Sequence, residues 1–126
     1  MAELYKQVVF RHYKSPLNKR KLIKPSKKFR GVNPFCGDSL EIFVKLDKSK
    51  KIKEIGWEGK GCTISQASAS ILTEMMKGKS LEQIKKIKSG QFLKNLNMNL
   101  SPSRRKCALL SLYTIKELDI TDQEAV

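Results

Sequence analysis

Three cysteines in this chain have the surroundings expected of metal-binding or reactive thiols. Cys36 lies within Asn33-Pro34-Phe35-Cys36-Gly37-Asp38, Cys62 within Gly59-Lys60-Gly61-Cys62, and Cys107 within Arg104-Arg105-Lys106-Cys107-Ala108. Glycines beside the first two allow tight turns that leave a sulfur approachable, and the cations before the third favour the thiolate. The thiolate is the form of cysteine that binds metal ions and attacks sulfur. We therefore expect metal binding or sulfur transfer.

A metal site with four ligands can be assembled from these segments. Cys62 precedes a predicted helix, whose free N–H groups favour a thiolate, and Asp38 lies two residues after Cys36. If Cys107 reaches the same place, three sulfurs and the Asp38 carboxylate suit tetrahedral zinc or iron. The cysteine pattern alone leaves an alternative open. The sequence has no Cys-x-x-Cys pair, and three small buried core residues give the same pattern.

The length and composition indicate one domain over residues 1–126, because 40% hydrophobic residues can close a single modest core. No apolar run approaches the roughly 18 residues needed to span a bilayer, so we expect no membrane partner. Glu3 and Lys6 interrupt the apolar stretch at the N-terminus, which argues against a signal peptide and predicts a cytoplasmic protein. An odd number of cysteines argues against a disulfide framework.

The formal charge of +14 raises the question of an acidic partner. The basic segment 14–30 is a plausible surface for acidic proteins or nucleic acid. Lysines are, however, spread through every segment, and no interleaved aromatic residues or recognised binding motif accompany them. Nucleic acid is therefore not predicted as the main partner, and a basic binding module remains the alternative of another functional class.

The elements before Cys62 should bring two of the cysteines together. Residues 3–14 predict a short amphipathic helix that includes His12, which we leave outside the site, and residues 15–35 predict an irregular basic connection. Strict alternation from Leu40 to Leu46, a turn, and a second apolar alternation predict a hairpin over 39–58. Because an antiparallel hairpin closes on itself, Cys36 and Cys62 are expected at the same edge of the sheet.

Helices should follow the hairpin. A helix is predicted from Thr63 to Gly78 with a Thr63/Gln66 capping box, and a second one, opened by a Ser80/Gln83 capping box, should carry Leu81, Ile84 and Ile87 and end before Gly90. A last helix from Ser101-Pro102 should place Cys107 beside the apolar stripe formed by Ala108, Leu112, Ile115 and Leu118, before an acidic tail that frays from Thr121. The predicted fold class is α+β, a small antiparallel sheet with helices packed on one face.

The same segments resemble those of a known family over nearly the whole chain. The matching stretches are 12–18 (HYKSPLN), 33–38 (NPFCGD), 59–70 (GKGCTISQASAS), 76–80 (MKGKS) and 105–108 (RKCA). In order and spacing they resemble the NifU/IscU/SufU family of iron–sulfur cluster assembly proteins, which implies a SufE/IscU-like fold.

The resemblance implies a function for the four candidate ligands. It implies that Cys36, Asp38, Cys62 and Cys107 bind zinc or a nascent iron–sulfur cluster, and that one cysteine accepts persulfide sulfur from a cysteine desulfurase. Downstream apo iron–sulfur proteins are the implied recipients. Thiolates suit such clusters, and a harder carboxylate ligand favours their release.

The position before Cys107 bears on the type of family member. IscU-type members carry histidine there, whereas Lys106 resembles the SufU type, in which zinc is often held and sulfur transfer is the clearer role. A protonated lysine cannot ligate a metal, but Lys106 can stabilise a thiolate or contact a persulfide. The interval 63–106 between the last two cysteines lacks the SufU-type insertion and is close to the IscU type. The two features point to different subtypes.

Our sequence-based hypothesis is an iron–sulfur assembly protein that accepts persulfide sulfur at a Cys3Asp metal site. Cys36 is the predicted acceptor, because its glycine-flanked loop can swing outward. The cofactor is predicted as zinc, with a transient iron–sulfur cluster as the alternative. A zinc-dependent sulfurtransferase activity and a transient [2Fe-2S] scaffold thus remain two interpretations of one site.

Overall fold

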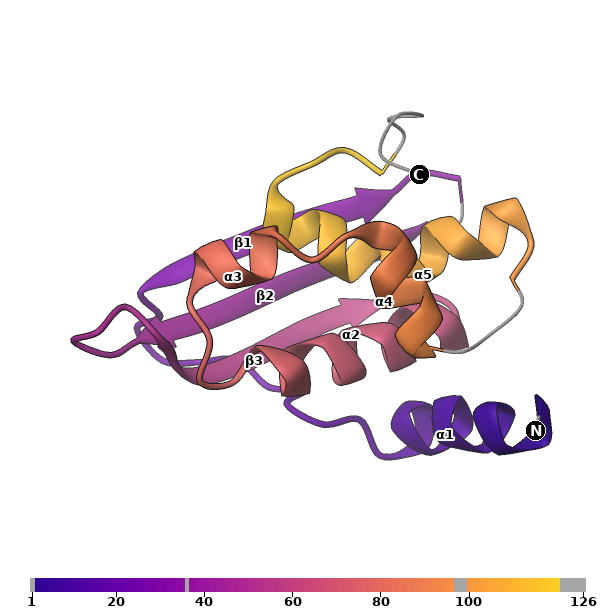
Figure 1. Ribbon diagram of the computed structural model, residues 1–126, viewed down its shortest axis with the longest axis horizontal. Coiled ribbons are helices and arrows are strands. Elements are labelled where there is room, and N and C mark those ends of the chain that lie inside the picture. The colour runs from indigo at the N-terminus through magenta and orange to yellow at the C-terminus, as the bar shows by residue number, and fades with distance from the viewer. Residues whose placement is uncertain (1, 36, 97–99, 121–126) are drawn as a thin grey trace.

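The computed structural model describes residues 2–35, 37–96 and 100–120 of the 126-residue chain. Its elements, in chain order, are α1 (Ala2–Lys14), β1 (Lys27–Asn33), β2 (Asp38–Leu46), β3 (Ile52–Lys60), α2 (Thr63–Met76), α3 (Leu81–Lys85), α4 (Ser89–Leu96) and α5 (Pro102–Lys116). The three strands form one antiparallel sheet in the order β1-β2-β3 (Figure 1).

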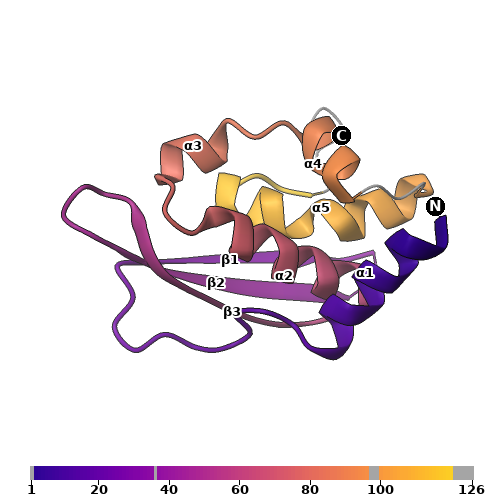
Figure 2. The same cartoon turned by 60° about the horizontal axis from the view of Figure 1, so that its bottom comes forward.

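The predicted hairpin and fold class are confirmed. β2 and β3 pair from Ser39 opposite Lys60 to Leu46 opposite Ile52. The alternation seen in the sequence turns Leu40, Ile42 and Val44 into the core, where they are at most 1% exposed. α2 and α5 contact the sheet on this face, and α3 and α4 lie outside them (Figure 2). The α+β architecture therefore places its helices on one face of the sheet.

The prediction of an irregular connection over residues 15–35 is wrong for its last part, because β1 occupies Lys27–Asn33. The inward positions of this strand are Phe29, Gly31 and Asn33, of which Phe29 alone is a large apolar residue. A Cβ at Gly31 would overlap the Thr114 side chain of α5, so the helix packs too closely to admit a larger residue. The apolar alternation that reveals a strand is therefore missing from the sequence.

The helix predictions are confirmed in outline and corrected in detail. The Ser80/Gln83 capping box is formed, but α2 begins after Cys62 as its N-cap, with no side-chain cap hydrogen bond, so the Thr63/Gln66 capping box is wrong. The helix predicted after Ser80 is shorter than expected, because α3 ends at Lys85 and Ile87 lies beyond it, and α4 was not predicted. α5 ends at Lys116, before Leu118, and the predicted fraying tail lies outside the described residues.

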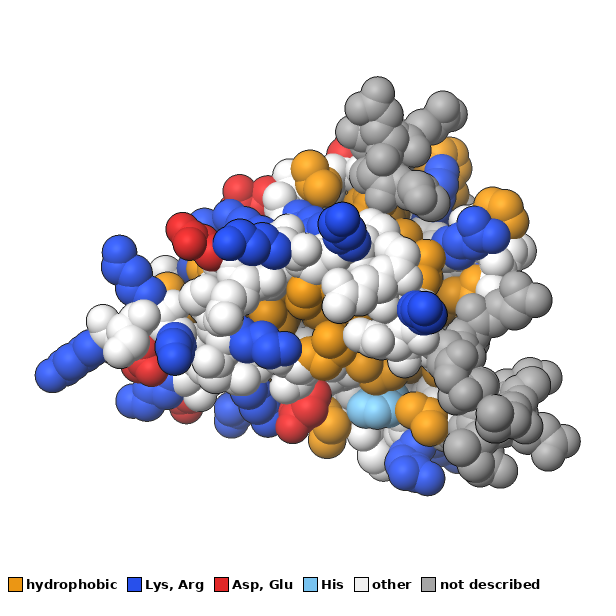
Figure 3. All heavy atoms as spheres, viewed as in Figure 1, with side chains coloured by type: hydrophobic (Ala, Val, Ile, Leu, Met, Phe, Trp, Pro, Cys, Tyr) orange, Lys and Arg blue, Asp and Glu red, His pale blue; other side chains and the backbone are white. Residues whose placement is uncertain are grey.

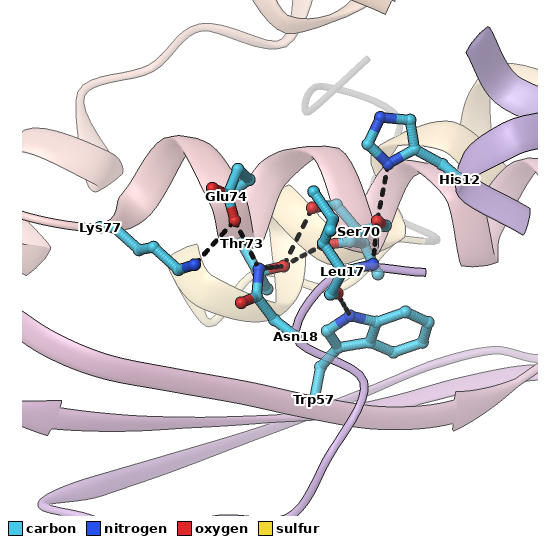
Figure 4. A network of polar contacts seen from close by, with 9 residues as sticks. His12, Leu17, Asn18, Trp57, Ser70, Thr73, Glu74 and Lys77 are labelled. Atoms are coloured by element: carbon cyan, nitrogen blue, oxygen red, sulfur yellow. Dashed lines mark hydrogen bonds and ion pairs between the residues drawn. The ribbon is translucent and has the colours of Figure 1, made fainter. Parts of the chain in front are cut away.

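A polar network fastens α1 and the segment after it to α2 and the sheet (Figure 4). The Nδ1 atom of His12 lies 2.7 Å from the Ser70 Oγ, and the Leu17 N–H donates to the same oxygen at 2.8 Å. The Trp57 indole N–H donates to the Leu17 carbonyl at 2.8 Å. Burial, and then the Arg11 charge, lower the pKa of His12 against an opposing effect of Glu74. His12 therefore ties α1 to α2, and the group of Asp38, Cys62 and Cys107 does not include it.

The charged surface is also as expected. Lysine and arginine side chains are scattered over the face seen in Figure 3 and are not gathered into one continuous stripe. None of the helices in the described part of the chain has the length and apolar content that a membrane crossing requires.

Candidate metal centre

Three of the predicted ligands meet at one end of the sheet. One carboxylate oxygen of Asp38 and the Sγ atoms of Cys62 and Cys107 all lie within 4.8 Å of one another. Asp38 is the first residue of β2, Cys62 is the N-cap of α2, and Cys107 lies in the second turn of α5. Three segments far apart in the sequence thus supply one donor atom each.

The fold explains why these donors converge. Because β2 and β3 run antiparallel, β3 ends at the end of the sheet where β2 begins. The first residue of β2 therefore lies beside the residues that follow β3. α5 contacts β1 and β2, which carries its second turn to the same edge. The sequence predicted the first step from the hairpin, whereas the second depends on helix packing that spacing does not reveal.

The carboxylate of Asp38 is buried and only half satisfied. Asp38 is 2% exposed, and its Oδ1 accepts a hydrogen bond from the Cys62 backbone N–H at 3.0 Å. Within residues 2–35, 37–96 and 100–120, its Oδ2 has no hydrogen-bond partner. A buried carboxylate oxygen without a partner costs free energy unless a proton or a cation satisfies it. This orphaned oxygen fits a metal ligand.

Gly61 allows its own backbone to lie close to the Asp38 carboxylate. A Cβ at position 61 would overlap the Asp38 carboxylate and lie 2.8 Å from the Ser65 Oγ. The Gly-x-Gly-Cys turn is therefore needed for space as well as for flexibility.

The two described thiols differ in exposure. Cys107 is 4% exposed, whereas Cys62 is half-buried at the beginning of α2, where backbone N–H groups are free of intrahelical partners. The Ser65 hydroxyl donates to the Cys62 carbonyl at 3.0 Å and lies 3.9 Å from its Sγ. Cys62 is thus the more accessible of the two.

Asn33 belongs to the site, although sequence reasoning did not select it. Its side-chain Nδ2 lies 3.9 Å from the Cys107 Sγ, and its Oδ1 accepts from the Phe35 N–H at 3.2 Å. Its carbonyl also accepts from the Gly37 N–H at 2.9 Å. Asn33 therefore ties the segment on both sides of position 36 to α5. An asparagine before proline at the start of a glycine-containing turn was the signal available in the sequence.

Lys106 and Cys36 are the other predicted site residues. The Lys106 Nζ lies over the ring of Phe35, 4.8 Å from its centroid, so this cation contacts the segment before Cys36. Phe35 is 69% exposed. Cys36 lies outside the described residues, and its roles as ligand and persulfide acceptor stay predictions.

The donor set suits a tetrahedral metal ion. Thiolate sulfur and carboxylate oxygen are both ligands of zinc and iron, and three donors at this spacing leave one position of a tetrahedron for a fourth. Two soft thiolates with one hard carboxylate favour these metals over calcium or magnesium, which prefer oxygen ligands.

Comparisons with known proteins identify relatives of the chain. Residues 4–120 match the family model described as NifU-like N terminal domain. The zinc-dependent sulfurtransferase SufU of Bacillus subtilis is 43% identical over 79 residues, which cover 63% of this chain and 52% of that protein. The iron–sulfur cluster assembly scaffold protein IscU of Haemophilus influenzae is 34% identical over 118 residues, which cover 89% of this chain and 90% of that protein. A solved structure of a candidate SUF-system scaffold from Fervidobacterium islandicum superposes with a TM-score of 0.78 at 25% identity, covering 92% and 96%.

Proposed function

The chain belongs to the family of NifU-like N-terminal domains, and on this premise we propose that it is an iron–sulfur cluster assembly protein that accepts persulfide sulfur at a Cys3Asp metal site. The observation that carries the proposal is the meeting of Asp38, Cys62 and Cys107 within 4.8 Å, with one buried carboxylate oxygen that no other described residue bonds. Cys36 is the proposed fourth ligand. The chain acts as a single domain over residues 1–126, in the cytoplasm, where thiols stay reduced.

The ligand set supports a metal that can be displaced. A bound zinc ion keeps its thiolate ligands deprotonated and ready to react. The Asp38 carboxylate is a harder ligand than the thiolates and binds a soft metal ion or cluster less firmly than they do. Its second oxygen also keeps the hydrogen bond to the Cys62 N–H, so Asp38 stays in place when the metal leaves.

The proposed transfer is a thiol exchange on a persulfide of a partner cysteine desulfurase. The Cys36 thiolate attacks the outer sulfur of the donor persulfide, a new S–S bond forms on Cys36, and the donor S–S bond breaks. The electron pair leaves with the donor cysteine as its thiolate, so no external oxidant or reductant is needed. Downstream apo iron–sulfur proteins are the proposed recipients, directly or as assembled clusters.

A transient [2Fe-2S] scaffold is the second candidate. It is favoured by the match to an IscU scaffold protein along 90% of that protein's length, whereas the match to the zinc-dependent SufU covers 52%. Anaerobic reconstitution separates the two candidates. A chromophore that transfers to an apo acceptor indicates a scaffold. Persulfide on Cys36, with zinc retained by the other three ligands, indicates a relay. The relatives' names give no support to the basic nucleic-acid-binding module.

The first test is the metal content of the natively purified protein by mass spectrometry. Asp38→Asn keeps an oxygen for the Cys62 N–H but replaces the unpaired oxygen by an amide, and Cys107→Ser removes a sulfur at a buried position. Asp47→Asn is the matched control, because Asp47 also accepts backbone N–H bonds but lies in the exposed turn between β2 and β3.

The expected result is about one metal ion per chain in the parent protein and in the control, and loss of metal in both site variants. Metal retained in Asp38→Asn and Cys107→Ser would overturn the site. Zinc supports the sulfur relay, and iron with sulfide supports the scaffold.

A further inference from the structure

The outer edge of β1 is a second exposed recognition feature, separate from the metal centre. β1 is a terminal strand in the order β1-β2-β3, so one side of its backbone faces away from the sheet. No strand, bridge or loop in the described ranges bonds to that side. Edges of this kind can accept a further strand, and charged side chains along them disfavour a strand of like charge.

The register identifies which backbone groups face outward. The Trp57 N–H donates away from the sheet to the Asn18 carbonyl at 2.9 Å, so Trp57 and Ile42 form a pair without mutual hydrogen bonds. Ile42 therefore bonds to Phe29 on its other side, in agreement with the Ser26 N–H bond to the Val44 carbonyl at 2.8 Å. The outward-facing N–H and C=O groups of β1 are those of Lys28, Arg30 and Val32.

A groove runs along this edge. It has a volume of about 450 Å³ between β1 and the end of α5 with the segment that follows. Apolar side chains of Leu110, Leu118 and Ile120 contribute to its wall together with the acidic residues Glu117 and Asp119, so this side suits apolar and not acidic side chains of a partner. Leu118 is 47% exposed, so the groove offers apolar surface to a partner. On this side of the sheet, an added strand would turn alternate side chains toward α5.

The opposite face of the same edge is basic. The inward position of Phe29 places Lys28 and Arg30 on the sheet face away from α5, and both are exposed. Lys28 pairs with Glu41 at 3.0 Å, and Arg30 lies opposite the same Glu41 in the register of β1 and β2, so two cations share one carboxylate and this face keeps an excess of positive charge. Antiparallel pairing with a second copy would set cations opposite cations, which is unfavourable. Charge complementarity therefore selects an acidic partner.

We propose that the β1 edge binds an extended acidic segment of a partner protein by strand addition. The backbone of that segment bonds to Lys28, Arg30 and Val32. Its alternate carboxylates face the two cations, and the side chains between them lie in the groove beside Leu118. β1 ends at Asn33, whose side chain lies 3.9 Å from the Cys107 Sγ, so the bound segment borders the metal centre.

The test is a titration of the isotope-labelled full chain with a short blocked peptide of alternating Glu and Val, followed by NMR and amide hydrogen exchange. Binding should protect the amides of Lys28, Arg30 and Val32 and should weaken as salt rises. Arg30→Glu should weaken binding about 2- to 30-fold, because a cross-strand attraction becomes a repulsion. Lys53→Glu, the same charge change at an exposed residue of β3, is the matched control and should leave affinity unchanged.

A second variant tests the backbone. Val32→Pro removes an outward N–H that takes no part in the ladder with β2 and changes no charge, and it should weaken binding about 2- to 10-fold through one lost hydrogen bond. Four outcomes would overturn the proposal: perturbations centred away from β1, equal weakening by Lys53→Glu, equal binding of an alternating Lys and Val peptide, or amides of the edge already protected without peptide. The last outcome would show that the edge is occupied by the chain itself or by a second copy.

Discussion

Asp38→Asn should make the protein more stable than the parent without metal and less stable than the parent with metal. In the metal-free chain the Asp38 side chain is buried, with one oxygen bonded to the Cys62 N–H and the other without a partner among the described residues. An unsatisfied buried polar atom costs about 1–3 kcal/mol, and more when it carries charge. The asparagine keeps the bonded oxygen and removes the charge. Without metal, the free energy of unfolding of the variant should therefore be about 1 kcal/mol higher than that of the parent.

The bound metal should produce the opposite order. A ligand present at 100 times its Kd stabilises the folded state by about 2.7 kcal/mol, and the variant forfeits this gain if Asp38 is a ligand. The parent should therefore be the more stable protein with zinc, and the variant the more stable one in chelator. For a chain of this size, each kcal/mol corresponds to a Tm change of about 3–5 °C, which calorimetry resolves.

The experiment compares both proteins and Asp47→Asn in chelator and in buffered zinc. A parent that is more stable than Asp38→Asn under both conditions would refute the reasoning, because the unpaired oxygen would then be satisfied without a metal. Equal zinc stabilisation of the two would refute the ligand assignment. Asp47→Asn should show the same response to zinc as the parent.

Three further predictions concern residues around the site and the α1 contact. Gly61→Ala should abolish metal binding and destabilise the fold by about 2–4 kcal/mol, because the new Cβ overlaps the carboxylate of the site. The control Gly90→Ala, at an α4 position with open space, should instead stabilise by about 0.5–1 kcal/mol in chemical denaturation. Lys106→Met should remove the cation–π contact with Phe35 and speed hydrogen exchange of the Phe35 amide, and unchanged exchange would contradict that role. The pKa of His12 is lowered in the folded protein, so as the pH falls the unfolded chain binds this proton at a higher pH than the folded chain does. The free energy of unfolding should therefore decrease as the pH drops below about 6.5. His12→Gln should flatten this dependence in urea titrations from pH 7 to about pH 5.

The sequence predicted the part of the site that depends on local geometry. Strict alternation over Leu40–Leu46 predicted the hairpin, and its closure predicted that the Cys36 segment and Cys62 share one edge. The position of Cys107 required the packing of α5 on β1, which depends on Gly31 and Thr114. No local pattern encodes such a contact, since it joins residues distant in sequence. The resemblance to a family, and not the spacing, supplied that ligand.

The missed elements have physical reasons of the same kind. β1 was hidden because glycine and asparagine fill two of its three inward positions, one for helix approach and one for bonds within the site. The Thr63/Gln66 pattern gave a false capping box, since the chain enters α2 through Cys62, whose backbone N–H is already bonded to Asp38. Sequence rules fail here because the site, and not the helix, determines the local hydrogen bonds.

The mixed ligand set follows from how the hairpin closes. The turn at Gly61 brings the Cys62 N–H toward the first residue of β2, and that N–H needs an acceptor because it is the donor at a buried helix entry. A thiol at position 38 is a weak acceptor and offers one atom, whereas a carboxylate accepts this bond with one oxygen and keeps the other for a metal. The residue that best completes the fold is thus also a harder ligand than cysteine. A set of four thiolates is therefore disfavoured by the architecture itself, and under the proposed function this mixed ligand set favours release of the metal or cluster.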